Sequence, residues 1–386
     1  MYVIKTLNGI SEIGLRRLPR GVYTVADEIA EPDALLVRSA DLHRIDIPSS
    51  VKAIGRAGAG TNNIPVAEMS RRGVVVFNTP GANANAVKEL VLAGMLLSAR
   101  NLAEALAFTA TLGERADPEA AMESDKKRFV GTELAGRTLG VVGLGAIGVK
   151  VANAARALGM RVFGLDPHMT VEGAWQLSSD VVKAGSLAEL YAASDYVSFH
   201  VPLNDATRGL FNDAALGAAR HGVVLLNFAR DGVVDAGTLR RGLAEGRIAR
   251  YVTDFPKVEF ADDPRVIALP HLGASTLEAV ENCAIMVVDQ VRDYLEHGNV
   301  ANAVNFPTTR MARAGQARVC VANRNVPNMI GQLSNVLGNA GINIAQMHNA
   351  SRGDLAYNLV DVETAVPEQV ARQLGAIEGI LSVRIV

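Results

Sequence analysis

Residues 143–148 read Gly-Leu-Gly-Ala-Ile-Gly, and this G-x-G-x-x-G pattern follows an apolar run of strand length and precedes a helix-like run. Glycines at this spacing form a tight turn that lets the backbone approach a pyrophosphate, and the N-terminus of the next helix offers free N–H groups to the phosphate charge. Asp166 ends the next strand-like run, 160–165, where a carboxylate would bind ribose hydroxyls. A carboxylate there repels the 2′-phosphate of NADP, and neither Pro167 nor His168 is an arginine that could hold it. The two features predict an NAD site; the alternative is a structural glycine turn beside a solvated aspartate.

Three residues farther along the chain have the types needed to oxidise a hydroxy acid. His271 follows a strand-like run in a turn that contains proline and glycine, and histidine removes an alcohol proton near neutral pH. Glu259, a short loop upstream, could accept the other imidazole N–H and orient the ring. Arg230 offers a planar pair of N–H donors for a substrate carboxylate. Taken singly, each has an ordinary alternative as a turn residue, a solvated loop carboxylate or a surface charge.

A parallel sheet would bring these residues, which lie far apart in sequence, to one place. Continuous apolar runs separated by helix-like segments are typical of a parallel sheet that is covered on both faces. In the middle of the chain the expected strands are 138–142, 160–165, 196–199, 223–226, 250–253 and 266–269. Ligands of such sheets bind beyond the carboxyl ends of the strands. The residues that close these runs are polar in five cases, namely Asp166, His200, Asn227, Asp254 and His271.

The two ends of the chain have their own patterns. Near the N-terminus the expected parallel strands are 34–37, 51–54 and 74–77, and a helix at 86–107 and a polar stretch at 113–128 follow. A helix at 276–296 leads to a linker at 307–316. The last part reads strand, helix, strand, strand, helix and strand at 317–321, 328–340, 344–348, 356–362, 367–374 and 381–386. That order predicts a ferredoxin-like βαββαβ unit.

The predicted fold class is therefore α/β, with two doubly wound parallel-sheet (Rossmann-like) domains and a C-terminal ferredoxin-like βαββαβ domain. A chain of 386 residues exceeds the size at which a single core keeps growing, so several domains are expected. We expect a discontinuous substrate-binding domain at 1–97 and 275–307, an NAD-binding domain at 98–274 and the small C-terminal domain at 315–386.

Composition excludes several kinds of partner. The formal net charge is −2 and the 38 basic residues are scattered, so we expect neither nucleic acid nor a membrane surface as a partner. The most apolar helical stretch, 90–99, is too short to cross a bilayer. Cys283 and Cys320 have neither metal nor redox spacing, and no metal site is expected. Because the start of the sequence lacks the pattern of a secretory signal, we expect a cytoplasmic protein.

Three segments of the chain resemble a known family. Residues 227–235 read NFARDGVVD, residues 254–259 read DFPKVE and residues 270–275 read PHLGAS. This series resembles the signature segments of the D-isomer-specific 2-hydroxyacid dehydrogenases. The N-terminal segments 37–39, 54–64 and 78–83 resemble the substrate-side loops of that family.

The resemblance implies roles for the candidate site residues. Arg230 would anchor the substrate carboxylate, Glu259 would partner His271, and His271 would take the C2 hydroxyl proton while hydride passes to the nicotinamide. Asp254 would hold the carboxamide of the cofactor and Asp166 its ribose. The implied NAD-binding residues are Gly143, Gly145, Ala146, Ile147, Gly148, Asp166, His200, Pro202, Phe228, Ala229, Asp254, Gly273 and Ala274.

A phosphorylated substrate would need a second cluster of positive charge. The candidate substrate-binding residues are Arg38, Ser39, Arg56, Gly58 and Lys126. A glycine lets backbone N–H groups approach a phosphate closely, whereas the basic run at 126–128 has an equally ordinary reading as a solvated face. In the family members that oxidise phosphoglycerate, a lysine at this place can reach a neighbouring subunit, so the resemblance implies a homodimer or homotetramer.

The C-terminal unit resembles an ACT regulatory domain. With it, the resemblance narrows to family members that oxidise (R)-3-phosphoglycerate to 3-phosphooxypyruvate, the first step of serine biosynthesis. Asn325 and Asn343 match the positions that hold the effector in those members, which makes L-serine a candidate effector. Asn323 replaces the frequent histidine, and Asn328 replaces the usual glycine, where its side chain either obstructs a close approach or caps the helix.

Two other positions depart from the pattern of the family. Asp231 stands where glycine usually follows the arginine, and Phe260 stands where proline usually follows the glutamate. Asp231 adds negative charge beside the proposed carboxylate anchor, which bears on the choice of substrate. We therefore keep two alternatives to phosphoglycerate oxidation: a dehydrogenase of another D-2-hydroxy acid, and a non-enzymatic NAD-sensing binding protein.

Overall fold

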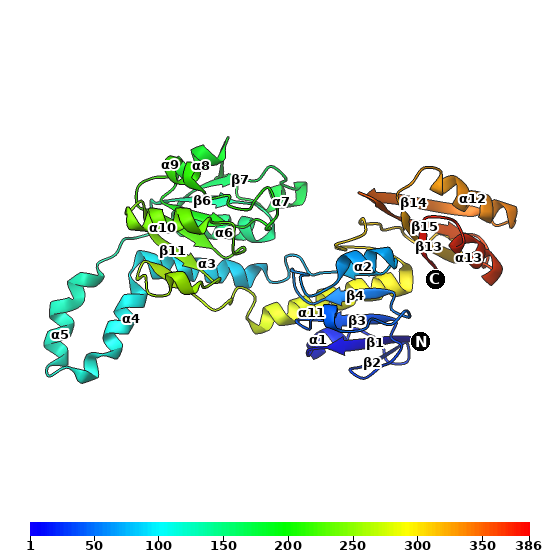
Figure 1. Cartoon of the computed structure of the whole chain (residues 1–386), viewed down its shortest axis with the longest axis horizontal. Helices are drawn as coiled ribbons and strands as arrows, with labels where there is room; N and C mark the ends of the chain where they lie inside the picture. The colour runs from blue at the N-terminus through cyan, green and yellow to red at the C-terminus, as the bar shows by residue number, and fades with distance from the viewer. The chain divides into compact units, whose positions relative to one another are not determined.

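The computed structural model describes all residues from Met1 to Val386, and the chain divides into two compact units. Unit 1 comprises Met1–Ala82 and Leu277–Val386, and unit 2 comprises Asn83–Thr276. The chain therefore begins in unit 1, builds the whole of unit 2 and returns to unit 1 through one long helix (Figure 1).

Unit 2 is built on a seven-stranded parallel sheet with the strand order β12-β11-β10-β9-β6-β7-β8. Its strands are β6 (Thr138–Val142), β7 (Arg161–Leu165), β8 (Val182–Lys183), β9 (Tyr196–Phe199), β10 (Val223–Asn227), β11 (Ile248–Thr253) and β12 (Val266–Ala268). The direction of winding reverses between β6 and β9, and sheets of this kind bind ligands at the carboxyl ends of the strands beside such a reversal. The predicted doubly wound sheet is confirmed, with β8 as an additional short strand.

Helices cover both faces of this sheet. They are α3 (Ala84–Ala99), α6 (Ala146–Ala157), α7 (Val171–Gln176), α8 (Leu187–Ala193), α9 (Asp213–Ala218) and α10 (Ala236–Ala244). Adjacent residues of β10 enter different cores, Leu226 with Val151 and Leu225 with Leu243. This explains why β6, β9 and β10 are buried at every residue and read as continuous apolar runs in the sequence.

The prediction of a single helix at 86–107 is wrong, because the structure has two helices there. α3 ends at Ala99, and α4 (Leu102–Ala110) begins after Asn101, whose φ of 52° lies in the left-handed region that interrupts a helix. The polar stretch that follows also contains a helix, α5 (Pro118–Asp125), which Asp117 caps by accepting a hydrogen bond from the Ala120 N–H at 3.0 Å. α4 and α5 form an extended hairpin in which neither helix has a buried residue (Figure 1).

Helix α3 belongs entirely to unit 2. Val87, Val91 and Met95 pack in the same core as Leu226 and Val252 of the seven-stranded sheet. The contacts of the chain therefore divide between Ala82 and Asn83, whereas the predicted boundary after residue 97 would cut this helix near its end. The functional labels given to the predicted domains stay a prediction.

Unit 1 contains a five-stranded parallel sheet with the order β2-β1-β3-β4-β5. Its strands are β1 (Tyr2–Leu7), β2 (Tyr23–Ala26), β3 (Ala34–Val37), β4 (Ala53–Arg56) and β5 (Val75–Phe77), and its short helices are α1 (Glu12–Leu15) and α2 (Val66–Arg71). β1 and β2 were not among the expected strands, because most of their residues are only partly buried and form no continuous apolar run.

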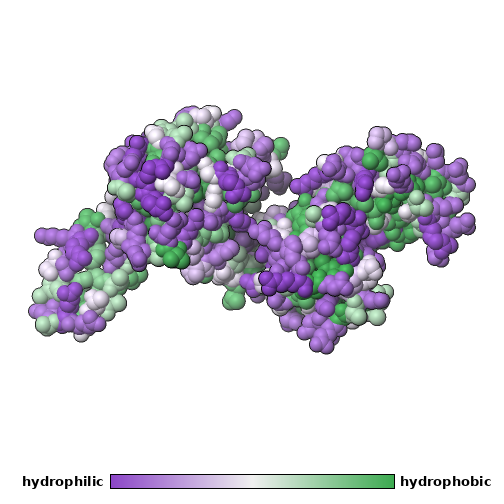
Figure 2. Space-filling view, in the orientation of Figure 1, coloured by the Kyte–Doolittle hydropathy of each residue, from purple (hydrophilic) through white to green (hydrophobic).

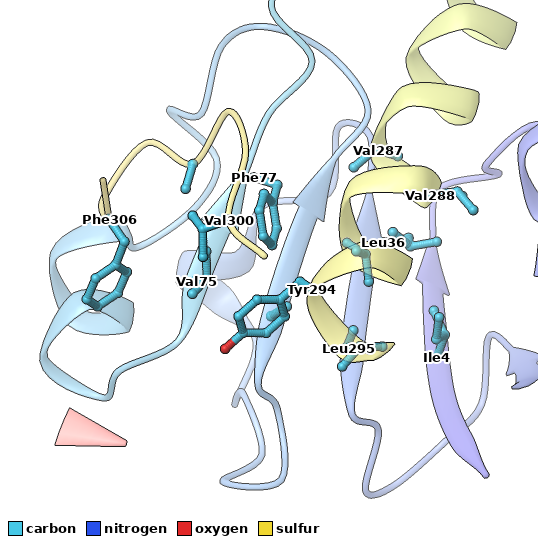
Figure 3. Packing of buried hydrophobic residues seen from close by; sticks show 14 of the residues in the cluster. Ile4, Leu36, Val75, Phe77, Val287, Val288, Tyr294, Leu295, Val300 and Phe306 are labelled. Atoms are coloured by element: carbon cyan, nitrogen blue, oxygen red, sulfur yellow. The ribbon is translucent and has the colours of Figure 1, made fainter. Parts of the chain in front are cut away.

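One long helix, α11 (Leu277–His297), packs against this sheet, close to the helix expected at 276–296. Figure 3 shows Val287, Val288 and Leu295 of α11 turned toward Ile4 and Leu36 of the strands. The ring of Tyr294 packs against Phe77 with its centroid 5.6 Å away. The helix therefore supplies one side of the core of unit 1.

The C-terminal part of unit 1 is an antiparallel sheet with the order β14-β15-β13-β16. Its elements are β13 (Ala317–Arg324), α12 (Met329–Asn339), β14 (Ile344–Arg352), β15 (Leu355–Val362), α13 (Glu368–Gly375) and β16 (Ile380–Ile385). This confirms the predicted βαββαβ order, and the arrangement of the four strands is that of a ferredoxin-like sheet.

Both faces of the four-stranded sheet are buried. Val319 and Val321 lie in the core formed with α12 and α13, whereas Cys320, Ala322 and Tyr357 lie in the core shared with α11 and the five-stranded sheet. This second face is called the docking face below. The alternation of side chains along β13 thus serves two different cores.

A buried ion pair fastens the docking face. Arg318 and Asp361 are fully buried, and the Arg318 Nε donates to Asp361 Oδ1 at 2.5 Å. The same guanidinium donates to the carbonyl oxygens of His297, at 2.9 Å, and Ala312, at 3.0 Å. The arginine therefore ties the sheet to the end of α11 and to the segment that connects them.

No single helix has the length and apolar character needed to span a membrane; α3 and the stretch Leu102–Glu114 pass such a test only as a pair, with a bend of 71° between them. On the face of the molecule seen in Figure 2, apolar residues form patches among hydrophilic ones.

Candidate active site

The three glycines of the predicted phosphate turn have different surroundings, which a side chain would affect in different ways. Gly143 has a φ of +90°, and a Cβ there would lie 2.6 Å from the His200 carbonyl oxygen. A Cβ on Gly148 would lie 1.9 Å from the Gly143 carbonyl oxygen, so this glycine lets α6 pack closely against the turn. A Cβ on Gly145 would meet nothing within 4 Å. Gly145 and Ala146 are exposed at the start of α6, which leaves the open side of the turn to a phosphate group.

Asp166 follows β7 and braces the same turn. One of its oxygens accepts a hydrogen bond from the Leu144 N–H and the other from the His168 N–H, each at 2.8 Å. A carboxylate oxygen has more than one lone pair, so both oxygens can still accept hydrogen bonds from ribose hydroxyls. The predicted carboxylate is therefore held beside the glycine turn.

His200 and Pro202 follow β9, next to the glycine turn. The His200 Nε2 lies 2.8 Å from Ser198 Oγ, and its Nδ1 is buried without a hydrogen-bond partner. Burial lowers the pKa of His200 to about 3, so the imidazole is neutral near pH 7. A buried, unpartnered ring nitrogen at this edge is free to bond a ligand.

Asp254 follows β11 and is buried, with 1% of its surface exposed. Its Oδ2 accepts a hydrogen bond from the Gly273 N–H at 2.9 Å, while its Oδ1 is buried without a partner. Burial raises the pKa of Asp254, although the Gly273 N–H and the nearby His271 and Arg230 act in the opposite direction. An unpartnered carboxylate oxygen fits the role of binding a ligand amide, which is the role predicted for it toward the nicotinamide carboxamide. Ala274 is exposed beside this contact.

The turn after β10 presents Arg230. Asn227 is fully buried. Its Nδ2 donates to the Arg230 carbonyl oxygen at 3.0 Å, and its Oδ1 accepts a hydrogen bond from the Ala229 N–H at 3.2 Å. Phe228, between Asn227 and Ala229 in the chain, packs in the core. The Arg230 guanidinium donates to the Ala229 carbonyl oxygen at 2.7 Å. Asp231, the departure from the family pattern, lies 3.0 Å from Lys257 Nζ. Its charge is thus partly compensated.

His271 and Glu259 follow the same sheet edge but have separate partners. His271 has a φ of 45°, a left-handed conformation uncommon for a residue with a Cβ, and its N–H donates to the Asp254 carbonyl oxygen at 2.9 Å. Its ring lies 4.9 Å from the ring of Phe255. Glu259, in the short helix Val258–Phe260, forms an ion pair with Arg240 of α10. The pairing of Glu259 with His271 therefore stays a prediction.

Four of the five predicted substrate-binding residues lie together in unit 1. Arg38 and Ser39 follow β3, and Arg56 ends β4, whose residues pair with those of β3 in the sheet. Gly58 has a φ of +147°, and a Cβ there would lie 1.3 Å from the Arg56 guanidinium, so the arginine lies across this glycine. Lys126 belongs to unit 2, where it is 62% exposed and forms an ion pair with Glu123.

The two predicted effector residues lie at opposite ends of the four-stranded sheet, because β13 and β14 both run antiparallel to β15, and Asn325 follows the end of β13 whereas Asn343 precedes the start of β14. Asn325 follows β13, and its side chain donates to the Gly353 carbonyl oxygen at 3.0 Å. Asn343 precedes β14, is exposed, and accepts a hydrogen bond from the Glu363 N–H at 3.2 Å through its carbonyl oxygen. Asn328 has a φ of 63° and stands at the start of α12 without a side-chain cap bond. Its left-handed backbone explains why a glycine suits this position.

Three contacts of the site were not predicted from the sequence. They are the tilted ring contact of Phe255 with His271, the ion pair of Glu259 with Arg240, and the ion pair of Asp231 with Lys257. Phe255 and Lys257 lie in the segment 254–259, which resembles the family, so the sequence offered a reason to expect them near the site. Arg240 lies on a helix between two strands, where it has no special feature in the sequence.

Comparisons with known proteins agree with the prediction of an NAD site at this edge of the sheet. Residues 92–273 match the model of the NAD-binding domain of the D-isomer specific 2-hydroxyacid dehydrogenases. A D-3-phosphoglycerate dehydrogenase of Bacillus subtilis (strain 168) is 36% identical over 297 residues, which cover 75% of this chain and 54% of the relative. A D-3-phosphoglycerate dehydrogenase of Methanocaldococcus jannaschii is 33% identical over 360 residues, covering 90% of this chain and 64% of the relative. The chain thus spans less than two thirds of the length of these relatives.

Solved structures are similar over most of the chain. The NAD+-bound 3-phosphoglycerate dehydrogenase of Entamoeba histolytica has a TM-score of 0.60 at 25% identity, covering 79% of this chain and 98% of that structure. A glyoxylate reductase from Paecilomyes thermophila has a TM-score of 0.62 at 25% identity, covering 78% and 98%. This fold is therefore shared by proteins named for different substrates, 3-phosphoglycerate in one case and glyoxylate in the other.

Proposed function

Because the chain belongs to the D-isomer specific 2-hydroxyacid dehydrogenase family, we propose that it oxidises (R)-3-phosphoglycerate to 3-phosphooxypyruvate with NAD, the first step of serine biosynthesis. The observation that carries this proposal is the placement of Arg230, Asp254 and His271 after β10, β11 and β12, which are neighbouring strands of one sheet. An arginine for the substrate carboxylate, a histidine for the proton and a carboxylate with one free oxygen for the cofactor, all at the carboxyl edge of one sheet, suit the oxidation of a hydroxy acid.

The residues at this edge fit NAD. The turn leaves open space at Gly145, Asp166 lies beside it, and two buried polar atoms, Asp254 Oδ1 and His200 Nδ1, have no protein partner. When bound, NAD supplies the acceptor for the hydride that leaves C2. The chain itself supplies the position of the nicotinamide and ribose and the exclusion of a 2′-phosphate by Asp166.

The protein residues would handle the carboxylate and the proton. Arg230 would bind the substrate carboxylate through two parallel N–H donors, which fixes the C2 carbon in place. An imidazole nitrogen of His271 would take the proton of the C2 hydroxyl. Glu259 would orient that imidazole only after leaving Arg240, and an ion pair whose side chains are 61% and 39% exposed contributes little and exchanges readily.

The substrate phosphate would bind at the edge of the sheet in unit 1. Arg38, Ser39, Arg56 and Gly58 lie at the carboxyl ends of two paired strands, and two guanidinium groups with a hydroxyl suit a phosphate dianion. This cluster supports phosphoglycerate over an unphosphorylated acid.

Another D-2-hydroxy acid is the second candidate substrate. Asp231 places a carboxylate next to Arg230, and a glyoxylate reductase has this fold at the same sequence identity as the phosphoglycerate enzyme. A 2-hydroxy acid without a phosphate carries less negative charge and would be affected less by that carboxylate.

The test of the proposed function is formation of NADH at alkaline pH from NAD and 3-phosphoglycerate, with D-glycerate and D-lactate in parallel. We expect strong preference for 3-phosphoglycerate. Arg56→Gln should raise KM for 3-phosphoglycerate by about tenfold or more and leave KM for D-glycerate almost unchanged, because a charge-assisted hydrogen bond contributes roughly 1.5–3 kcal/mol. Equal rates with all three substrates would overturn the assignment of the phosphate cluster.

We further propose that the C-terminal unit is an ACT domain that binds L-serine at Asn325 and Asn343, with the two residues contributed by two paired copies because they lie at opposite ends of the sheet in one chain. Initial rates and the melting temperature should both change across a serine titration, and Asn343→Ala should abolish both responses. A titration that moves neither quantity would exclude serine as an effector.

Assembly and location complete the proposal. A homodimer or homotetramer is supported by the exposed position of Lys126 in the α4–α5 hairpin, from which it could reach a neighbouring subunit. A cytoplasmic location is supported by two free, buried cysteines, which suit a reducing compartment. Sedimentation of the purified chain at several concentrations tests the first point.

A further inference from the structure

One face of helix α11 lines a pocket in unit 1, together with Gly81 and Ala82 at the end of the segment 78–83. The helix residues that line it recur every three or four positions, so they share one stripe: Asn282, Ile285, Met286, Asp289, Gln290 and Asp293. Ala82 and Arg310 line it from other segments, and its volume is about 650 Å³. The opposite stripe of the helix, with Val287 and Val291, is in the core. The pocket is therefore a second, polar side of a core helix.

Gln290 is the unusual residue of this pocket. Only 6% of the residue is exposed, and neither its Nε2 nor its Oε1, both buried, has a hydrogen-bond partner. Leaving a buried donor and a buried acceptor unpaired costs about 1–3 kcal/mol each. A group that both accepts and donates would satisfy the two atoms at once, and a carboxamide does so in a single planar contact.

The charges of the pocket balance each other. Asp289 Oδ1 lies 2.6 Å from Arg17 Nε, and Asp293 Oδ2 lies 3.8 Å from Arg310 Nη2. A ligand with a net positive or negative charge would leave one of these groups without compensation. A zwitterion would not, because its ammonium could bind Asp293 while its carboxylate binds Arg310. The long Asp293–Arg310 separation leaves room for such an exchange of partners.

We propose that this pocket binds a zwitterionic α-amino acid whose side chain carries a carboxamide. The ammonium pairs with Asp293, the carboxylate with Arg310 and the amide with Gln290. Ile285 and Met286 supply apolar contact for the methylene groups between them. The proposal does not rest on the proposed dehydrogenase activity, nor on the serine positions Asn325 and Asn343, which belong to other elements.

Titration calorimetry on the full chain, without NAD or substrate, tests the proposal directly. The probes are L-glutamine and L-asparagine, and L-norvaline is the control that has an aliphatic side chain and no amide. We expect at least one of the two amides to bind with a dissociation constant of about 1 mM or lower, and at least tenfold more tightly than L-norvaline. Failure of the enzyme assay would leave this measurement unaffected.

Two variants and a matched control locate the site. Gln290→Leu should abolish binding of the amide and raise the melting temperature of the free chain, because it removes two unpaired buried atoms. Gln373→Leu makes the same change at an exposed position of α13 and should leave binding unchanged. Arg310→Gln, at a side chain that is 62% exposed, should weaken binding at least tenfold even if the core variant fails to fold.

Three results would overturn the proposal. They are the absence of binding by both amides up to about 10 mM, well above the expected dissociation constant; equal binding of L-norvaline; and unchanged binding in folded Gln290→Leu or Arg310→Gln protein. Absence of binding together with a higher melting temperature of Gln290→Leu would show that the two unpaired atoms lower the stability of the chain and serve no ligand.

Discussion

The ligand edge of unit 2 and the docking face of unit 1 bury polar groups in opposite ways. On the docking face, Arg318 and Asp361 have no exposed surface, yet the guanidinium donates to a carboxylate and to two carbonyl oxygens. At the ligand edge, Asp254 Oδ1 and His200 Nδ1 are equally buried and have no partner. Because an unpaired buried polar atom costs about 1–3 kcal/mol, the completed Arg318–Asp361 pair indicates a structural role, and the open atoms of Asp254 and His200 indicate a place that a ligand completes.

Replacement of the histidine at the open edge should have the largest effect. In His271→Asn, we expect turnover to fall by about 10²–10⁴, the usual contribution of a general base, while NAD affinity stays nearly constant. Steady-state rates and NAD titration by calorimetry measure the two quantities. His221→Asn, at an exposed residue before β10 on the opposite edge, is the control and should retain activity. More than a tenth of wild-type turnover in His271→Asn would mean that another residue takes the proton.

Breaking the completed pair on the docking face should instead cost stability. In Asp361→Ala we expect the free energy of unfolding to fall by about 3–5 kcal/mol, because the Arg318 charge is left buried and unpaired. Denaturant unfolding followed by circular dichroism measures it. The double variant Arg318→Met, Asp361→Leu should lose less than the single variant, since it removes both charges. Equal losses in the two proteins would show that packing, not charge, fastens this face.

Neutralising the open carboxylate should separate stability from binding. Burial raises the pKa of Asp254, so as pH rises above about 3.9 the unfolded chain loses its proton first and the carboxylate increasingly disfavours folding. Asp254→Asn should therefore be more stable than wild type at pH 7 by about 1 kcal/mol, with the advantage shrinking as pH falls toward 4. NAD binding should weaken by about tenfold through loss of one charge-assisted contact. Lower stability at pH 7 would contradict the idea that this atom is left open for a ligand.

The smallest effect is expected at the departure from the family pattern. Asp231 pairs with Lys257, so its charge is already partly balanced. Asp231→Gly should change KM for 3-phosphoglycerate by less than about fivefold, in line with an exposed ion pair worth at most ~1 kcal/mol. Lys257→Gln, which leaves the aspartate unbalanced beside Arg230, should raise KM more than Asp231→Gly changes it. The reverse order would mean that Asp231 contacts the substrate.

The sequence predicted the parts of the fold that are buried on both sides. β6, β9 and β10 read as continuous apolar runs because each of their faces meets helices. The ends of β7, β9, β10 and β11 marked Asp166, His200, Asn227 and Asp254. β1 and its neighbour at the sheet edge, β2, are only partly buried and gave no such run. The break between α3 and α4 depends on the left-handed backbone of Asn101, which composition does not reveal.

Side-chain partners were predicted less well than positions. Arg318 and Asp361 lie directly opposite each other in the pairing of β13 with β15, a fact that appears only once the register is known. Glu259 bonds Arg240 because α10 passes near the short helix that holds the glutamate, and nothing in the spacing of these residues shows it. Residue type and strand order can place a functional group at an edge, but the direction of its side chain depends on neighbours contributed by other elements.

The docking face also has a consequence for how such a chain could be assembled from parts. A Cβ on Gly298 would lie 2.1 Å from Cys320 Sγ, and the Arg384 guanidinium lies 4.0 Å from the centre of the Tyr294 ring. A shortened chain that ended before β13 would bare Tyr294, the end of α11 and the apolar surface around them. The C-terminal sheet therefore depends on specific contacts with the end of α11. Grafting it onto another dehydrogenase would require the recipient helix to bring a glycine and an aromatic ring at the matching places.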